Sequence, residues 1–208
     1  MDFSVGSFFD LSSFEHRAVF DDCRYVWQVL ERLKKYLSCQ TLGTKACPEG
    51  VFFDHPELIF IGEGTFIEPG AYIRGPCIIG RDCQIRHGSY IRGNVLIGDR
   101  CVVGHATEIK HSILLNGAKA AHFAFVGDSV LGNDVNLGAG VKCANLRLDG
   151  RPLMIRCGEE KIQTGLRKLG AIIGDGCQIG CNAVANPGTL IGKGARCRPL
   201  TNLSGVIS

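Results

Sequence analysis

The sequence predicts an all-β solenoid built from short parallel strands. Between Ile61 and Leu114 the chain repeats every six residues, and Ile or Val holds the first place in all nine repeats. The fifth place of the repeat is mostly small. A period of six fits neither a helix nor a simple strand, whose side-chain periods are about 3.6 and 2. Such a repeat is typical of a solenoid whose walls each point one branched side chain into a shared core.

The repeat also carries a family resemblance. Its first places are held by Ile61, Ile67, Ile73, Ile79, Ile85, Ile91, Ile97, Val103 and Ile109. At this spacing the chain resembles the left-handed parallel β-helix of hexapeptide-repeat acyltransferases, in which three repeats form one triangular coil of eighteen residues. The resemblance implies that residues eighteen apart stack on the same face. The predicted fold class is therefore a left-handed parallel β-helix with an N-terminal α-helical segment.

The repeat is not perfect along the chain. After Ile109 its phase continues through Leu115 and Ala121, and then slips. The repeats restart two places out of register at Phe125, Leu131 and Leu137, and they resume after an interruption at Ile173, Ile179, Ala185 and Ile191. Irregular backbone in a regular scaffold is a common place for a functional site. The tail after Cys197 looks too short to carry another repeat.

Composition limits the function classes. The net charge of +3 is too small to argue for a nucleic-acid partner. The first residues do not form a secretory signal, and no stretch approaches the eighteen apolar residues of a membrane span. Four of the 11 cysteines, namely Cys77, Cys83, Cys101 and Cys177, hold the small place of a repeat, where free Cys acts as a compact apolar residue. We therefore expect free thiols, no membrane partner and a cytoplasmic location.

Residues 1–50 are predicted to form an N-terminal helical cap. The first twenty residues carry five Phe and no clear period, so we expect an irregular segment that packs against the solenoid. From Asp21, a plausible N-cap, apolar residues recur at helical spacing, at Val26, Leu30, Leu33 and Leu37. One amphipathic helix is expected, and its expected role is to cover the open end of the solenoid. Partner binding is the alternative role.

The solenoid is predicted to span residues 51–202, with a basic arm interrupting it at residues 143–170. Within this arm, apolar residues alternate on either side of Asp149-Gly150, which predicts a β-hairpin that turns at that pair. The basic residues of the arm are Arg147, Arg151, Arg156, Lys161, Arg167 and Lys168. We expect the arm to protrude from the solenoid and to reach toward a neighbouring subunit.

Two features point to chemistry. Arg74, Arg92 and Lys110 occupy the second place of their repeats at intervals of eighteen, so they form one column on the predicted coil. A phosphate would relieve the repulsion within such a column, although a solvated basic stripe is an equal alternative. In the same phase, the second place is later held by His122, whose imidazole could accept a proton near neutral pH.

The run from Glu108 to Gly150 resembles the acetyltransferase half of bifunctional N-acetylglucosamine-1-phosphate uridyltransferase/glucosamine-1-phosphate acetyltransferase. It is closer still to archaeal sugar-1-phosphate nucleotidylyltransferases with the same C-terminal β-helix, which also share the segments Ala144–Arg147 and Arg167–Ala171. The resemblance implies an acetyl-CoA-dependent N-acetyltransferase acting on an amino-sugar 1-phosphate, in the UDP-N-acetylglucosamine pathway. It also implies a homotrimer with sites between neighbouring subunits, and no metal.

The same resemblance assigns roles to individual residues. His122 matches the catalytic base that deprotonates the sugar amine. The matched substrate-binding residues are Arg92 and Lys110, which hold the sugar phosphate, together with Asn136 and Asn145. Ala139 lies where the family brings backbone near the thioester, and Cys181 falls where a Ser often stands in the turn that faces coenzyme A.

Two departures from the family leave alternatives open. Phe125 replaces a Tyr whose hydroxyl contacts the acceptor, and no Gly-rich nucleotide loop precedes the solenoid, so we do not expect nucleotidyl transfer by this chain. A non-catalytic β-helix that binds a sugar nucleotide, or that partners a separate nucleotidyltransferase subunit, is the second hypothesis. A zinc site of the γ-type carbonic anhydrase kind is the third, since the sequence offers His87, His105, His111 and His122.

Overall fold

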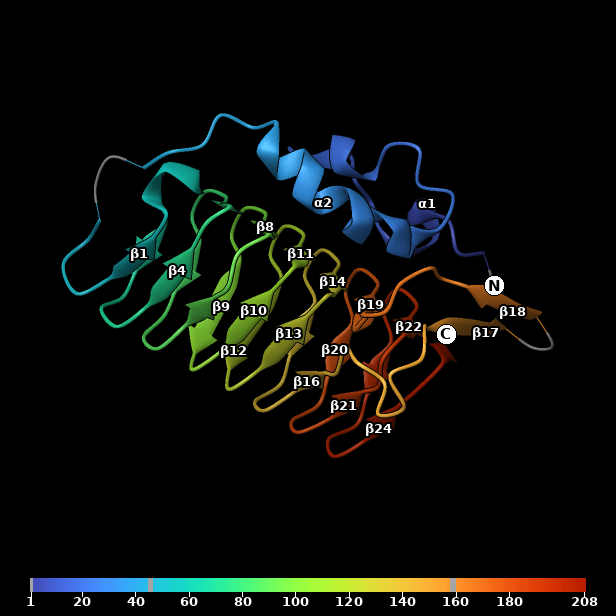
Figure 1. The fold of residues 1–208 in the computed structure, drawn as a ribbon. Helices are drawn as coiled ribbons and strands as arrows, with labels where there is room; N and C mark the ends of the chain where they lie inside the picture. Colours follow the sequence, from blue (N-terminus) through green and yellow to red (C-terminus); the bar gives the residue numbers. More distant parts are fainter. Residues whose placement is uncertain (1, 45–46, 158–159) are drawn as a thin grey trace.

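A computed structural model describes residues 2–44, 47–157 and 160–208, and it shows a long stack of coils with helices along one side (Figure 1). Successive coils contribute strands to three parallel sheets, which we call faces A, B and C. Faces A and B each have eight strands and face C has seven. The predicted fold class, a left-handed parallel β-helix with an N-terminal helical segment, is confirmed.

The strands are short, as expected for hexad walls. Face A comprises β1 (Phe52–Asp54), β4 (Tyr72–Arg74), β7 (Tyr90–Ile91), β10 (Glu108–Lys110), β13 (Phe125–Gly127), β16 (Lys142–Cys143), β21 (Val184–Ala185) and β24 (Asn202–Leu203). Face B comprises β2 (Ile59–Ile61), β5 (Cys77–Ile79), β8 (Val95–Ile97), β11 (Ser112–Leu114), β14 (Val130–Leu131), β19 (Ala171–Ile173), β22 (Thr189–Ile191) and β25 (Val206–Ile207). Face C comprises β3 (Phe66–Ile67), β6 (Gln84–Ile85), β9 (Val102–His105), β12 (Lys119–His122), β15 (Asn136–Leu137), β20 (Gln178–Ile179) and β23 (Arg196–Cys197).

The interior is filled by the branched residues of the repeat, stacked coil on coil. On face B, for example, Ile61 pairs with Ile79, which pairs with Ile97. Those fifth-place residues that carry a polar atom also reach backbone carbonyls of the next coil, namely Thr65, Cys83, Ser89, Cys101 and Thr107. The Sγ–H of Cys83 donates to the carbonyl of Gly98 at 3.1 Å. The size limit at the fifth place therefore has a structural cause.

The described cysteines fit this interior. None of the ten whose side chains the structure describes is in a disulfide, as predicted. Cys77, Cys83, Cys101, Cys143 and Cys177 are buried. Burial raises the pKa of the Cys143 thiol to about 12 and that of the Cys177 thiol to about 11. These thiols are therefore protonated, apolar core groups at neutral pH.

The change of register comes two corners of the coil earlier than predicted, between Ile109 and Leu114. Ile97 pairs with Leu114, so this coil has 17 residues rather than 18. The core places then fall on Leu114 and Ala120, whereas we predicted Leu115 and Ala121. Leu115 is also buried, but it packs on the outside of the solenoid against the N-terminal segment. Burial by a second layer therefore concealed the slip in the sequence pattern.

The residue is lost at the corner between faces A and B. Ile97 pairs with Leu114 and Leu114 pairs with Leu131, each 17 residues on, so one residue is lost at this corner in each of two successive coils. At this corner His111 and Asp128 adopt positive φ angles of 45° and 47°. Few residues other than glycine adopt this conformation, and those that do often have side chains that bond locally. The register change therefore lies at the corner between faces A and B, and not after Ala121, where the sequence predicted it.

The N-terminal segment contains more helix than predicted. Its elements are α1 (Val5–Phe8), η1 (Arg17–Phe20), η2 (Val26–Gln28) and α2 (Val29–Ser38), and a further short helix, η3 (Pro56–Leu58), precedes β2. The main helix therefore begins at Val29 and not after Asp21. The short helix η2 lies directly before it, and the Gln28 side chain caps η2 by accepting a hydrogen bond from the Tyr25 backbone N–H at 2.9 Å. None of the described helices has the length and the apolar run that a membrane crossing needs.

The predicted position of this segment at the open end of the solenoid is wrong. Helix α2 and the residues before it lie along face B (Figure 1). Trp27, Leu33 and Leu37 are at most 1% exposed in a cluster that includes Leu96 and Ile113 of face B. The physical reason is that face B is apolar on its outside as well as its inside, so the largest uncovered apolar surface is a side of the solenoid.

The arm and the tail also differ from the prediction. In the arm, β17 (Met154–Cys157) pairs with β18 (Glu160–Gln163), and residues 158–159 between them lie outside the described part of the chain. The chain does turn at the predicted place, where the Gly150 N–H donates to the Arg147 carbonyl at 3.1 Å. The predicted β-hairpin at Asp149-Gly150 is nevertheless wrong, because no strand lies in the fully described stretch between Cys143 and Met154 and Leu148 is fully exposed. Strands β24 and β25 continue the coil beyond residue 202, where we expected it to end.

Candidate active site

The basic column lies on face A where the spacing placed it. Arg74, Arg92 and Lys110 each follow the inward residue of β4, β7 and β10, and the paired register of those strands stacks them. Each side chain, however, already has an acidic partner within this chain. The ion pairs are Arg74–Asp54 (2.6 Å), Arg92–Glu108 (2.6 Å) and Lys110–Asp128 (3.0 Å). The column is therefore neutralised along its length.

These ion pairs differ in how exposed their side chains are. The Arg92 and Glu108 side chains are 40% and 33% exposed, whereas the Asp128 side chain is only 9% exposed. The hydrogen bond from Arg92 to Glu108 raises the pKa of the guanidinium. A pair as open as Arg92–Glu108 contributes about 0–1 kcal/mol, so a competing anion could replace the carboxylate at little cost.

Asp128 is the centre of the more buried group. Its Oδ2 accepts from Lys110 Nζ at 3.0 Å and from Asn145 Nδ2 at 2.5 Å. The ring of Phe125 ends beside the same group, because a Cβ added to Gly127 would lie 2.8 Å from both Phe125 Cζ and Asn145 Nδ2. The structure thus brings Lys110, Asn145 and Phe125 together around a carboxylate.

Sequence reasoning missed all three acidic partners. Asp128 is eighteen residues after Lys110, so a search for opposite charge at the interval of the column would have found it. Asp54 and Glu108 lie 20 and 16 residues from their arginine partners, and that search would have missed them. Their presence changes the chemistry, since an anion that binds Lys110 has to displace or share the Asp128 carboxylate.

His122 lies at the corner between faces C and A. Backbone bonds along this corner run from Phe123 N to His105 O (2.8 Å) and from Gly140 N to His122 O (3.0 Å). The next bond in the series runs from Asn182 N to Ala139 O (2.8 Å). These bonds stack His122, Ala139 and Cys181 at equivalent places on successive coils. The structure therefore brings together the predicted base and the two predicted cofactor-binding residues.

Three histidines share this corner, but their rings differ in bonding. His87 Nδ1 is 2.7 Å from the carbonyl of Pro69, and His105 Nδ1 is 3.1 Å from the carbonyl of His87. The two rings stack with centroids 5.7 Å apart. The His122 side chain is exposed, and no described residue forms a hydrogen bond with its ring. Both of its ring nitrogens are available to a substrate.

The other predicted residues lie on the outer faces. Arg92, Lys110 and Asn145 lie on or beside face A, and Asn136 lies on the outside of face C. The His122 corner separates these two faces. Within one chain the predicted acceptor-binding residues and the predicted donor-binding residues therefore occupy adjoining surfaces rather than one enclosed pocket.

One of the four histidines of the zinc hypothesis lies away from the other three. His111 lies at a different corner, where its Nε2 is 3.0 Å from the carbonyl of Leu30 and holds helix α2 against the solenoid. Burial lowers the pKa of this imidazole. Among residues 2–44, 47–157 and 160–208, no three His, Cys, Asp or Glu side chains are grouped closely enough to hold a metal ion.

The fold and the stacked corner define a hexapeptide-repeat β-helix protein, and comparisons with known proteins narrow this class. The family model of the GMPPB C-terminal domain matches residues 73–156. The bifunctional sugar-1-phosphate nucleotidylyltransferase/acetyltransferase of Sulfurisphaera tokodaii is 43% identical over 86 residues. The bifunctional protein GlmU of Methanococcus aeolicus is 38% identical over 88 residues. The central part of this chain is therefore homologous to the C-terminal regions of sugar-1-phosphate nucleotidyltransferases.

The extent of these matches is limited. They cover 41% and 40% of this chain, and they span only 21% of the length of each of the two relatives. Among solved structures, a Bacillus cereus protein described provisionally as an acetyltransferase shares 18% identity, with a TM-score of 0.42 over 72% of this chain and 74% of that one. The sequence relatives, rather than this structural likeness, carry the relationship.

Proposed function

We propose that this chain is an acetyl-CoA-dependent N-acetyltransferase that acts on an amino-sugar 1-phosphate. The sequence relatives include a bifunctional nucleotidylyltransferase/acetyltransferase, and this supports an acyltransferase. The observation that carries the proposal is the exposed imidazole of His122, which shares one corner with Ala139 and Cys181 on the following coils. A proton acceptor thereby lies beside the surface assigned to the thioester.

In the proposed reaction, His122 accepts a proton from the neutral sugar amine as the amine nitrogen attacks the thioester carbonyl. The tetrahedral intermediate then breaks its carbon–sulfur bond, and the coenzyme A thiolate takes up a proton to leave as the thiol. An imidazole can accept and return a proton near neutral pH. His122 meets the geometric requirement because no described protein group occupies its ring nitrogens.

The acceptor's phosphate is proposed to bind at Arg92 and Lys110, with Asn145 and Asn136 contacting the rest of the sugar. Binding would exchange Glu108 for phosphate on Arg92, and would rearrange the group formed by Lys110 and Asp128. The loss of the exposed pair costs little, and phosphate offers more acceptor oxygens than a carboxylate.

A homotrimer is part of this proposal. Because the corner and the basic column lie on adjoining surfaces, a neighbouring prism set beside the corner would complete the site from a second face A. Sedimentation at micromolar concentration tests this arrangement. A stable monomer that nevertheless transferred acetyl groups would contradict the intersubunit site.

The unpaired buried cysteines support the expectation of a reducing compartment such as the cytoplasm.

One observation favours a second candidate function. The basic column is neutralised by its own carboxylates and Phe125 lacks the family hydroxyl, so this chain could instead be a non-catalytic partner of a separate sugar-1-phosphate nucleotidyltransferase. The deciding measurement is thiol release from acetyl-CoA in the presence of glucosamine 1-phosphate or galactosamine 1-phosphate. Acceptor-dependent release supports the enzyme. Its absence, together with tight binding of such a nucleotidyltransferase, supports the partner subunit.

A further inference from the structure

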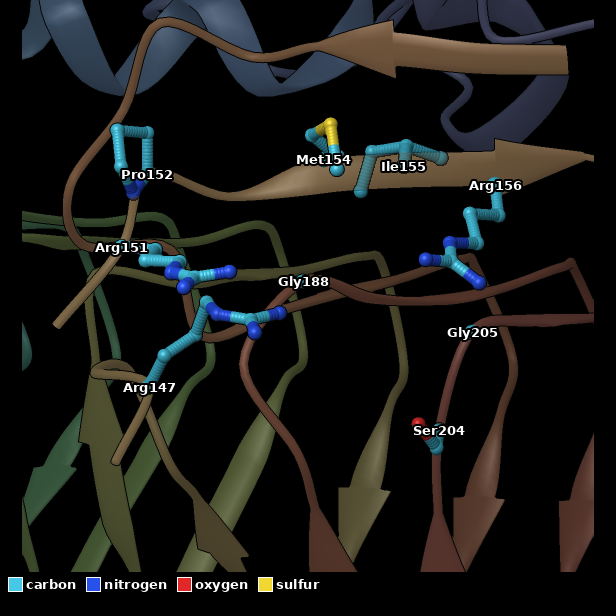
Figure 2. Close-up of a pocket in the computed structure, with 9 residues that line it drawn as sticks. All are labelled: Arg147, Arg151, Pro152, Met154, Ile155, Arg156, Gly188, Ser204 and Gly205. Carbon is cyan, nitrogen blue, oxygen red and sulfur yellow. The ribbon is translucent and has the colours of Figure 1, made fainter. Parts of the chain in front are cut away.

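A hollow of about 320 Å³ lies between the arm and the last coils, apart from the His122 corner (Figure 2). It is lined by Arg147, Arg151, Pro152, Met154, Ile155, Arg156, Gly188, Ser204 and Gly205. Three of these residues are arginines and none is acidic. The guanidinium ends of Arg147 and Arg151 lie close together at one side, and the Arg156 guanidinium points toward the same hollow from β17 (Figure 2).

The three arginines are not equally occupied. Arg147 forms a two-point bond with Asp149, from Nε to Oδ1 at 2.8 Å and from Nη2 to Oδ2 at 2.5 Å. This contact lowers the pKa of the Asp149 carboxyl. The guanidinium groups of Arg151 and Arg156 have no ion-pair partner among the described residues. Among the residues that line the hollow none is acidic, and the Asp149 carboxyl, whose pKa the Arg151 charge also lowers, is already bonded to Arg147.

The backbone that carries these arginines is held in place. Leu153 and Ile155 are each 2% exposed and pack under the arm, while Met154 and Arg156 alternate to the outside. Leu153 is bonded on both sides, because its N–H donates to Leu166 O at 3.0 Å and its carbonyl accepts from Thr164 Oγ1 at 2.8 Å. Arg156 is thus presented by strand β17, and Arg151 lies just before that strand, where its backbone N–H donates to Asp149 Oδ1 at 3.2 Å.

Gly188 lets the arm approach the solenoid so closely. A Cβ built on Gly188 would lie 3.1 Å from Leu153 Cδ2 and 3.4 Å from Ile155 Cδ1, and its φ angle of 80° also disfavours a side chain. The Ser204 hydroxyl at the rim has no hydrogen-bond partner among the described residues. The hollow therefore presents arginine guanidinium groups together with the Ser204 hydroxyl, which forms no hydrogen bond with the described residues.

We propose that this hollow binds the diphosphate group of a small molecule. Guanidinium groups bond phosphate oxygens in pairs, and arginines on two sides of one hollow suit two linked phosphates better than a single carboxylate. Coenzyme A and nucleoside-diphosphate sugars both carry such a group, so the shared chemistry is the diphosphate. The proposal stands independently of acetyl transfer, because it rests on the arm and not on His122.

The first test is direct binding of inorganic pyrophosphate to the full chain by calorimetry. We expect saturable binding that weakens as salt rises, with inorganic phosphate at least about tenfold weaker because it lacks the second phosphate. The double variant Arg151→Ala/Arg156→Ala should lose roughly 10- to 100-fold in pyrophosphate affinity. Both side chains are exposed, so its thermal unfolding should match the wild type.

The matched control is Arg167→Ala/Lys168→Ala, which removes the same charge from exposed positions of the same arm outside the hollow. It should bind pyrophosphate nearly as the wild type does. Equal losses in both double variants would reduce the effect to net charge, and would overturn the site. So would a wild type that does not bind pyrophosphate at millimolar concentration and low salt.

Competition identifies the source of the diphosphate. Coenzyme A that displaces pyrophosphate while a uridine-diphosphate sugar does not would assign the hollow to the acyl donor, and the reverse would assign it to a sugar nucleotide. Displacement by neither would overturn the proposal, since the hollow would then not admit a diphosphate within a larger molecule. An inactive acetyltransferase that still binds pyrophosphate would separate this inference from the proposed function.

Discussion

Faces A and B of the solenoid have equivalent interiors and opposite exteriors. The residue just before the inward one is apolar along face B, at Ile78, Leu96, Ile113, Val130, Ile172 and Leu190, and all of these are at most 2% exposed. The same place on face A holds Tyr72, Tyr90, Glu108, Phe125 and Lys142, and none of these is buried. The inward places build the coil, and the outward places decide what lies against it.

The difference explains where the N-terminal segment lies and where chemistry is available. Face B has a second apolar layer, so helix α2 and its aromatic neighbours cover it and remove it from solvent. Face A keeps polar and charged groups in water, where a ligand can reach them. A solenoid with only one interior thus provides one side for packing and another for binding.

The largest expected effect tests the corner that borders face A. His122→Ala should lower kcat for acetyl transfer by roughly 10²- to 10⁴-fold, the range that a general base supplies, with little change in stability. Steady-state thiol release measures this effect. The matched variant is His105→Ala, one coil earlier at the same corner, which should retain most of the activity. A fully active His122→Ala variant would show that the base is elsewhere.

The covered and open exteriors can be compared with the same substitution. Val130→Ala on face B removes two methyl groups from a fully buried position, and should cost about 2–3 kcal/mol of unfolding free energy. Val102→Ala removes the same groups from the outside of face C, where the residue is only partly buried, and should cost less than about 1 kcal/mol. Denaturant unfolding of the two variants measures both losses of unfolding free energy. Equal costs would mean that the N-terminal segment contributes little to face B.

The basic column of face A should affect binding more than turnover. Lys110→Ala and Arg92→Ala should each raise KM for the phosphorylated acceptor about tenfold while kcat changes little, because the phosphate is remote from the reacting amine. Arg74→Ala is the matched control, since it lies in the same column and has its own ion pair with Asp54. If all three variants behave alike, the column acts through net charge and not as a phosphate site.

The smallest expected effect concerns Phe125. Phe125→Tyr would add a hydroxyl where the ring already ends beside Asn145, and one new neutral hydrogen bond should raise kcat/KM by roughly 2- to 10-fold. Stability should change by no more than about 0.5 kcal/mol, because the ring is only partly buried. If neither the wild type nor this variant transfers acetyl groups to an amino-sugar phosphate, the partner-subunit alternative replaces the enzyme.

The sequence by itself determined the solenoid, because its period depends only on local geometry. A branched residue at every sixth place and a small one before each corner leave few other ways to bury so many apolar groups. The same periodicity stacked Arg74, Arg92 and Lys110. His122, Ala139 and Cys181 came from the family resemblance, and the structure places them on one corner. Whether these residues act as proposed remains a prediction.

Only the tertiary structure decided what covers each side. The cover on face B depends on contacts between residues such as Leu33 and Leu96, which are far apart in sequence, although the apolar residues that recur once per coil on that face were a readable signal. The ion pairs of Glu108 and Asp128 likewise depend on neighbours brought together by the coil. The repeat specifies the stack of coils. Charge pairing and docking of the N-terminal segment depend on residues far apart in sequence, which become neighbours only once the stack has formed.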